Sequence, residues 1–186
     1  MGNLDTDCIN ATQNWLNDVV IQHNICPFAK RERDRGSIRF AVEHEIDIET
    51  CLFNLIEECF NLDEQGDIQT TLIIYANAFT DFDDYLDFLT LAEDLLIEQG
   101  YDGIYQLASF HPNYYFSDVA PDDASNYTNR SPYPMLHLLR EDSIEQALAT
   151  HPDPNVIPQR NIRLMRQLGA ETLQNLLTAC YAKHLK

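Results

Sequence analysis

Residues 70 to 76 form an uninterrupted β-branched and apolar run, TTLIIYA, without a charged side chain. A run of this length and composition is typical of a strand, and a strand without polar alternation needs cover on both of its faces. That environment occurs in the middle of a parallel sheet, where helices lie above and below. The run therefore predicts a central strand and requires the rest of the chain to supply covering helices.

Helical and strand-like patterns alternate along the rest of the chain, which at 186 residues is long enough for one domain. Helical spacing of apolar residues occurs in Asp5–Asn24, Ile48–Gly66, Asp81–Gln99, Asp142–Thr150 and Pro158–His184, the last interrupted at Gly169. Strand-like patterns occur in Ser37–Glu43, which alternates as an edge strand does, and in Gly103–Phe110. Strands alternating with helices favour crossover connections. The sequence thus predicts a single α/β domain over residues 1–186, with a small, mainly parallel sheet of three to four strands and helices on both faces.

The composition narrows the range of partners and the cellular compartment. A net charge of -18 argues against nucleic acid and against an acidic membrane surface, because charge repulsion slows association with polyanions. Five of the twelve basic residues nevertheless fall between Lys30 and Arg39, which leaves room for a local anion site. Five cysteines without a CxxC pair, an N-terminus without a basic start or an apolar run, and no segment of ~20 apolar residues indicate a cytoplasmic protein with reduced thiols.

Polar residues follow each predicted strand. His44 and Glu45 follow the first strand, 77–81 follow the second, and His111 follows the third. The carboxyl ends of parallel strands lie at one edge of a sheet, so these clusters are expected to converge on a ligand crevice. The region from His111 to Pro134 has no regular periodicity, and a loop of about twenty-four residues in a compact domain is usually functional.

Arg130 and Ser131 are the leading candidates for binding an anion. They precede a proline-led stretch, Pro134 to Glu141, that is expected to form a short helix whose N-terminus and the Arg130 guanidinium would hold a phosphate or carboxylate. His137 and Arg140 are three residues apart and would share a face of that helix. Alternatively, Arg130 pairs with Asp122 or Asp123 and only fixes the loop.

His111 is the candidate acid or base, because histidine titrates near neutral pH and this one follows the third strand. Asp123 would orient its ring, and Asn126 with Tyr127 would shape the pocket. The alternative is a histidine that bonds to the loop backbone and fixes the turn before Pro112.

Cys26 is a candidate nucleophile that would act together with His111. Its predicted position after the end of a helix opposes thiolate formation, although Lys30 and Arg31 would favour it. The alternative is a packed Cys-Pro turn. A metal held by His111, His137 and one aspartate lacks any fixed ligand spacing, so no metal is predicted, and the sequence identifies no cofactor.

Three segments also resemble a known family. NICPFA near the first helix, ASFHP after the third strand, and DDASNYTNRSPYPMLHLLRE over residues 122–141 make the chain similar to a family of bacterial proteins known as domain-of-unknown-function family 1415. The resemblance covers most of the chain. It implies no reaction, ligand or partner, and supports only the expectation that the three segments belong together.

These features favour an enzyme that acts on a small phosphate- or carboxylate-bearing metabolite, in a crevice formed by residues 110–141. The alternative is a non-catalytic ligand-binding or protein-interaction module that uses the same loop as its recognition surface. A homodimer is the ordinary expectation for a soluble domain of this size.

Overall fold

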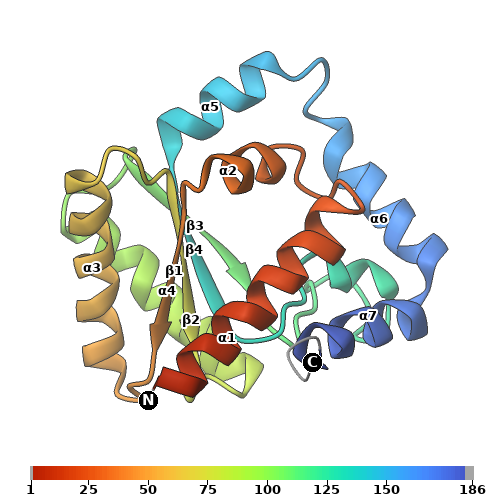
Figure 1. Cartoon of the computed structure of the whole chain (residues 1–186), viewed down its shortest axis with the longest axis horizontal. Helices are drawn as coiled ribbons and strands as arrows, with labels where there is room; N and C mark the ends of the chain where they lie inside the picture. Colours follow the sequence, from red (N-terminus) through yellow and green to blue (C-terminus); the bar gives the residue numbers. More distant parts are fainter. Residues whose placement is uncertain (1, 183–186) are drawn as a thin grey trace. The chain divides into compact units, whose positions relative to one another are not determined.

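The computed structural model describes residues 2–182, and these divide into two compact units (Figure 1). The helical unit consists of Met1–Lys30, Phe110–Tyr133 and His151–Lys186, and the sheet unit consists of Arg31–Ser109 and Pro134–Thr150. Each unit is assembled from segments that are distant in the sequence. Since the chain passes back and forth between the units, the prediction of one domain over residues 1–186 stays a prediction.

The sheet unit contains a four-stranded sheet in the order β1-β2-β4-β3. The strands are β1 (Ile38–Glu43), β2 (Thr70–Tyr75), β3 (Tyr105–Phe110) and β4 (Met135–Arg140). β1 pairs with β2 in parallel from Ile38 opposite Thr70 to Glu43 opposite Tyr75, whereas β4 pairs with β2 antiparallel, with Thr70 opposite Leu139. As predicted, β1 lies at an edge of the sheet, and the TTLIIY run of β2 is central, with all six residues buried.

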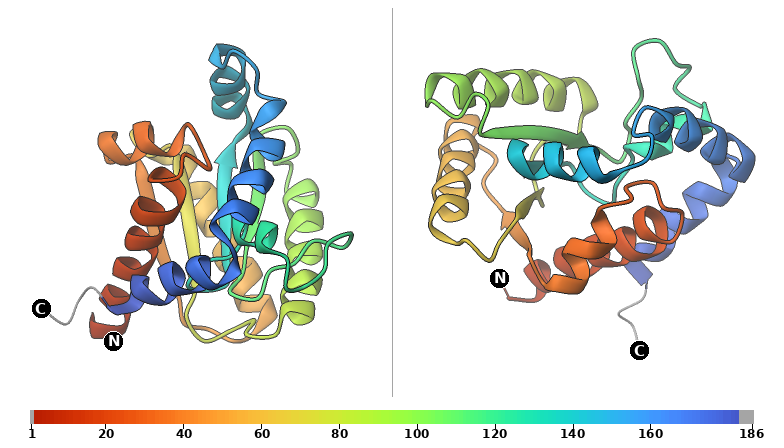
Figure 2. Two further views of the ribbon diagram at one scale, coloured as in Figure 1. Left: turned by 90° about the vertical axis from the view of Figure 1, so that its right-hand side faces the viewer. Right: turned by 90° about the horizontal axis from the view of Figure 1, so that it is seen from above.

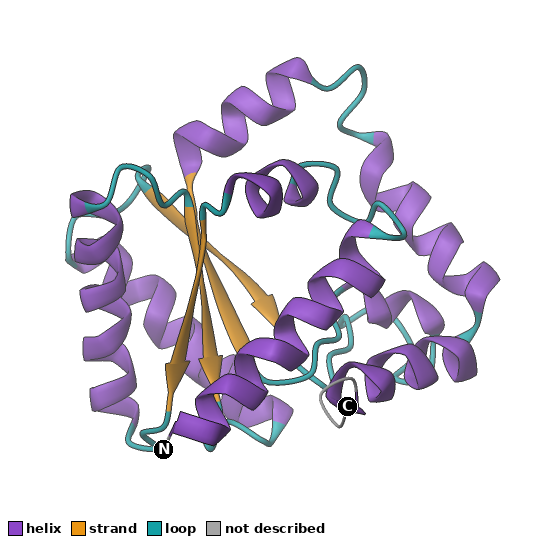
Figure 3. Cartoon of the chain, in the orientation of Figure 1, coloured by secondary structure: helices purple, strands orange, loops and turns teal. Residues whose placement is uncertain are grey.

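The predicted α/β class is confirmed, but the prediction of a mainly parallel sheet is wrong. β1, β2 and β3 run in the same direction, while β4 runs the other way between β2 and β3 (Figure 3). The sheet is therefore mixed and mostly antiparallel. Crossover connections link β1, β2 and β3, as their alternation with helices predicts.

The error arises in residues 134–141, where Met135–Arg140 form β4 and not the predicted short helix. Pro134 suits the first turn of a helix, but it also suits the residue before a strand. The apolar run that follows lacks alternation because Met135, Leu136 and Leu138 are all fully buried inside the sheet. Short apolar runs do not distinguish a buried strand from a buried helix, and a preceding proline is compatible with both.

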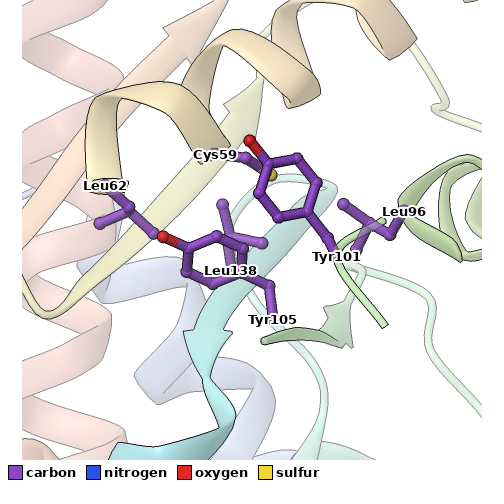
Figure 4. Close-up of a cluster of buried hydrophobic side chains, with 6 residues drawn as sticks. All are labelled: Cys59, Leu62, Leu96, Tyr101, Tyr105 and Leu138. Atoms are coloured by element: carbon purple, nitrogen blue, oxygen red, sulfur yellow. The ribbon is translucent and has the colours of Figure 1, made fainter. Parts of the chain in front are cut away.

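Helices α3 (Ile48–Glu64) and α4 (Phe82–Glu98) connect the parallel strands and pack on one face of the sheet. Each begins at an aspartate whose side chain accepts backbone N–H groups of the first turn, Asp47 for α3 and Asp81 for α4. Their inner faces join side chains of β3 and β4 in a buried cluster. Figure 4 shows this cluster, which comprises Cys59, Leu62, Leu96, Tyr101, Tyr105 and Leu138.

Two further helices complete the connections of the sheet unit. α5 (Glu141–Thr150) follows β4 directly, close to its predicted bounds. α2 (Ala29–Arg35) was not predicted, because its sequence AKRERDR has no apolar stripe and none of its residues is buried. It begins in the helical unit and continues into the sheet unit.

The helical unit is built from α1 (Gly2–Trp15), the π-helix η1 (Leu16–Ile21), the 3₁₀ helix η2 (Ala124–Thr128), α6 (Val156–Leu168) and α7 (Ala170–Ala182). Figure 2 shows α1 beside α7, and Asn14 donates a hydrogen bond to the carbonyl oxygen of Cys180 across this contact. Gly169 separates α6 from α7 with a φ of 80°, a conformation that favours glycine. Among the described residues, no helix combines the length and the apolar character that crossing a bilayer requires.

Candidate functional site

The segment from His111 to Tyr133 is folded on itself around the side chain of Asn126. The Asn126 amide donates hydrogen bonds to the carbonyl oxygens of Ala120 (2.8 Å) and Pro121 (3.3 Å), and its Oδ1 accepts the N–H of Phe116 (3.2 Å). Asn126 has no exposed surface, so these bonds replace bonds to water. The side chain predicted to shape a ligand pocket thus holds the backbone of the segment.

Arg130 makes a second set of contacts with the same backbone. Its Nε donates to the carbonyl oxygen of Tyr114 (3.0 Å) and its Nη2 to that of Pro121 (2.8 Å). The guanidinium lies 4.5 Å from the ring centre of Tyr127, in cation–π contact. The Arg130 N–H groups that were predicted to bind an anion therefore bind peptide carbonyls. The alternative, an ion pair between Arg130 and Asp122 or Asp123, does not form.

His111 and Ser131 are fully buried and bind the backbone of the segment. The Nδ1 of His111 accepts the N–H of Asn113 (3.0 Å), so a neutral ring carries its proton on Nε2. The backbone N–H of His111 donates to the carbonyl oxygen of Asn129 (3.2 Å), and the hydroxyl of Ser131 donates to that of Tyr133 (2.6 Å). These contacts match the turn-fixing alternative for His111.

Asp123 begins η2 and is paired with an arginine of α6. Its Oδ1 accepts the N–H of Ser125 (2.8 Å), and both carboxylate oxygens accept bonds from Arg166 at 3.0 to 3.2 Å. The Arg166 guanidinium, followed by the Ser125 amide, holds the pKa of Asp123 well below its usual range. The carboxylate predicted to orient His111 therefore neutralises Arg166 at the surface.

Residues 22–26 form a tight turn after the π-helix. Asn24 has a φ of 53°, and its N–H and that of Ile25 donate back to Ile21 and Val20, which closes the helix end. Arg160 then donates to the carbonyl oxygens of both His23 (3.0 Å) and Asn24 (2.8 Å). α6 thereby fixes the turn that carries Cys26.

The Cys26 side chain lies in that turn, just before α2. Burial raises the pKa of the Cys26 thiol above its ordinary value of 9.0, and it outweighs the backbone N–H groups of Phe28 and Ala29, which favour the thiolate. Cys26 thus lies between the end of the preceding helix, which opposes the thiolate, and the start of α2, which favours it. At neutral pH the group is a protonated thiol.

Two residues that were predicted to bind the ligand, His137 and Arg140, belong to β4 in the sheet unit. Positions three apart on a strand point to opposite faces, so the two side chains do not share a surface. The Nε2 of His137 lies 2.6 Å from the Thr70 hydroxyl, and burial lowers the pKa of His137 to about 4. Arg140 donates to the Tyr105 hydroxyl and to the carbonyl oxygen of Leu62, near the end of α3.

Also in the sheet unit, the polar residues that follow β1 and β2 meet as predicted. The side chain of Asn77 donates a hydrogen bond to the carbonyl oxygen of His44 (3.0 Å). Glu43, at the end of β1, accepts the N–H of Glu45 (2.8 Å) and a bond from the Asn54 amide. Within the described residues, no group of three His, Cys, Asp or Glu side chains has an arrangement that could hold a metal ion.

The sequence reading missed an arginine stripe on α6. Arg160, Arg163 and Arg166 follow at three-residue intervals on a helix that has no acidic residue, so successive guanidinium groups lie on adjacent turns. Arg160 binds the 23–24 turn and Arg166 binds Asp123, whereas Arg163 is exposed and has no hydrogen-bond or ion-pair partner among residues 2–182. The signal in the sequence is the regular spacing of these three arginines. It stands out because the chain has only 12 basic residues.

Comparison with curated proteins and with solved structures returns no match. A family model described as "protein of unknown function (DUF1415)" matches residues 7–175. The match includes the turn around Cys26, the segment around Asn126 and all of α6, which are the parts brought together in the helical unit. It confirms the resemblance drawn from the three sequence segments, and the chain belongs to this DUF1415 family.

Proposed function

We propose that the protein binds a small phosphate- or carboxylate-bearing molecule in its helical unit, with the α6 arginines as the cationic part of the site. The observation that carries the proposal is the exposed Arg163, which has no counter-ion among the described residues of a chain with a net charge of -18. Guanidinium groups bind phosphate and carboxylate through paired N–H donors. Arg130, the first candidate from the sequence, supports the site by shaping the neighbouring segment.

Arg166 would complete the cationic site by exchanging partners. Arg163 and Arg166 are neighbours on α6, and like charges at this spacing repel unless an anion lies between them. The side chain of Arg166 is 55% exposed and its partner Asp123 is 25% exposed, and exposed ion pairs contribute little to stability. A ligand carboxylate or phosphate can therefore displace Asp123 at small cost and contact both arginines.

A binding role is favoured over catalysis by the state of the two candidate reactive groups. His111 is fully buried and bound to the loop backbone, and the Cys26 thiol is protonated at neutral pH. The second candidate function is an enzyme that acts on the same class of molecule. It is supported by the backbone N–H groups of Phe28 and Ala29, which favour the Cys26 thiolate, and by the adjacent π-helix, a feature frequent at functional sites.

Isothermal titration with inorganic phosphate, phosphate monoesters and dicarboxylates tests the binding proposal. Arg163→Gln is expected to weaken binding about tenfold, because one charged contact is lost. Asp123→Asn is expected to strengthen it, since asparagine keeps the helix cap while the competing charge is removed. Arg35→Gln, which removes another exposed arginine, is the control and leaves the affinity unchanged. Equal affinities for all four proteins, or no heat with any anion, would refute the proposal.

The enzyme alternative is tested by alkylation of individual cysteines, followed by mass spectrometry. If Cys26 is a nucleophile, its alkylation rate reaches a plateau near neutral pH, and it does so also when phosphate is bound. A thiol of raised pKa reacts slowly until the pH exceeds about 9.

We also propose that the protein is located in the cytoplasm, which is supported by its five free cysteines.

A further inference from the structure

The side of α3 that faces away from the sheet carries an alternating row of acidic and aromatic residues. These are Glu49, Phe53, Glu57, Phe60 and Glu64, hereafter the outer α3 row, and all five are exposed. Their spacing of three or four residues keeps them on one face of the helix. We propose that the outer α3 row is a docking surface for a basic amphipathic helix of a partner protein.

The two phenylalanines are the apolar anchors of this surface. Phe53 is 63% exposed and Phe60 is 53% exposed, although α3 already buries a complete inner face against the sheet. Seven residues separate them, which is two helical turns or about 10.5 Å. Two large apolar side chains at this spacing are the pattern by which one helix recognises another.

The Phe60 ring is held in place from one side. It makes an edge contact with the Tyr101 ring, with 6.4 Å between the ring centres, and Tyr101 follows the end of α4. One anchor is therefore ordered before any partner arrives, which lowers the entropy lost on binding.

The charge around the anchors selects the chemistry of the partner. α3 and α4, the two helices beside the sheet in Figure 1, together contain eleven acidic residues and no Lys or Arg. Glu58 is neutralised by Arg39, and Asp63 accepts bonds from two tyrosine hydroxyls, but both lie outside the outer α3 row. A partner with Lys or Arg on either side of its apolar residues meets a carboxylate at each position.

The same charges argue against other occupants. A second copy of this chain docked through the row would place glutamate against glutamate, and an anionic lipid surface would also be repelled. A complementary helix has apolar residues seven apart with basic residues between and beyond them. Such a helix pairs its cations with Glu49, Glu57 and Glu64 while its apolar residues cover Phe53 and Phe60.

The probe is a fluorescent synthetic helix with leucines seven residues apart and lysines at the flanking positions, titrated with the full chain by anisotropy. Two matched peptides accompany it: a scrambled one of the same composition, and one with glutamate in place of lysine. The basic amphipathic peptide is expected to bind at least tenfold more tightly than either, with an affinity that falls at higher salt. Equal binding of the scrambled peptide would overturn the proposal, because charge alone would then account for it.

Variants locate the binding on the outer α3 row. The double change Phe53→Ser with Phe60→Ser, and separately Glu57→Lys, are each expected to weaken the peptide complex about tenfold. Ile97→Ser, which removes another exposed apolar side chain (58%) on α4, leaves it unchanged. If loss of the Tyr101 contact unfolds the double variant, Phe53→Ser alone decides. Unchanged affinity in Phe53→Ser and Glu57→Lys, or self-association that these changes abolish, would contradict the proposal.

Discussion

His137 links the pH dependence of stability to one partly buried side chain. Its ring lies beside the Thr70 hydroxyl, which donates to the carbonyl oxygen of Leu138 and so accepts from Nε2–H of a neutral imidazole. Burial lowers the pKa of His137 from 6.5 to about 4, so the unfolded chain binds the proton more tightly. The stabilisation that the neutral imidazole gives the folded state is complete above pH 6.5 and is lost as the pH falls toward 4. We expect the free energy of unfolding, measured with urea, to fall by on the order of 2–3 kcal/mol over this interval.

The matched variant for this prediction is His137→Gln, whose amide can donate to Thr70 without titrating. Carboxylates also titrate at the acidic end of the interval, so the difference between the two proteins isolates the histidine. The variant is expected to lose less stability between pH 6.5 and pH 4. Parallel pH profiles would show that the imidazole is hydrated in the folded state.

Arg130→Lys separates a structural from a ligand-binding role at that position. A lysine cannot reach the carbonyl oxygens of both Tyr114 and Pro121 while covering Tyr127, because it lacks the planar fork of donors. We expect the substitution to lower the free energy of unfolding by about 1–3 kcal/mol in urea titrations. Arg163→Lys, on the exposed face of α6, is the control and is expected to change stability by less than about 0.5 kcal/mol. Wild-type stability of Arg130→Lys combined with loss of phosphate binding would make Arg130 a ligand contact.

At the scale of elements, the sequence predicted those whose side-chain periodicity reflects one buried face. α3, α4 and the edge strand β1 follow from spacing, and β2 follows from its continuous apolar run. β4 did not, because a strand buried on both faces loses the alternation that identifies a strand. α2 did not either, since a helix that buries none of its residues has no apolar stripe to detect.

The sequence drew attention to the segment after β3 but did not reveal what its polar side chains bind. Composition singled out the segment after β3, but its structure depends on bonds such as those from Asn126 and Arg130 to Pro121, which follow no repeat. Residue type alone does not reveal whether a polar side chain binds the backbone or a ligand. Only the contacts distinguish the two, and they shifted the proposed cationic site from Arg130 to α6.

Asn126→Ala tests whether the segment from His111 to Tyr133 depends on one side chain. The change leaves the Ala120 carbonyl and the Phe116 N–H without a buried partner, and each such group costs about 1–3 kcal/mol. We expect hydrogen exchange of the amides in this segment to accelerate more than exchange in β2. Asn113→Ala, at an exposed position of the same segment, is the control. Equal acceleration in the segment and in β2 would mean that the segment opens only when the whole chain unfolds.

At the scale of the whole molecule, the dominant feature is the uncompensated negative charge. A net charge of -18 over 186 residues opposes the compact state, and eleven of the acidic side chains lie on α3 and α4 alone. Salt reduces this repulsion, because the screening length falls from about 30 Å at 0.01 M to about 8 Å at 0.15 M. Stability should therefore increase with salt, opposite to the behaviour of a protein held together by surface ion pairs.

We expect the melting temperature at pH 7 to rise by roughly 2–4 °C between about 0.01 M and 0.15 M sodium chloride, which corresponds to about 1 kcal/mol at this chain length. Chloride binding at the α6 arginines would produce a rise of the same sign. Arg163→Gln separates the two causes, since screening acts on all charges and persists in this variant, whereas a site-specific effect disappears. A salt response confined to the protein with Arg163 intact would attribute the stabilisation to anion binding at α6, and a melting temperature that falls with salt would show that attractive ion pairs outweigh the repulsion.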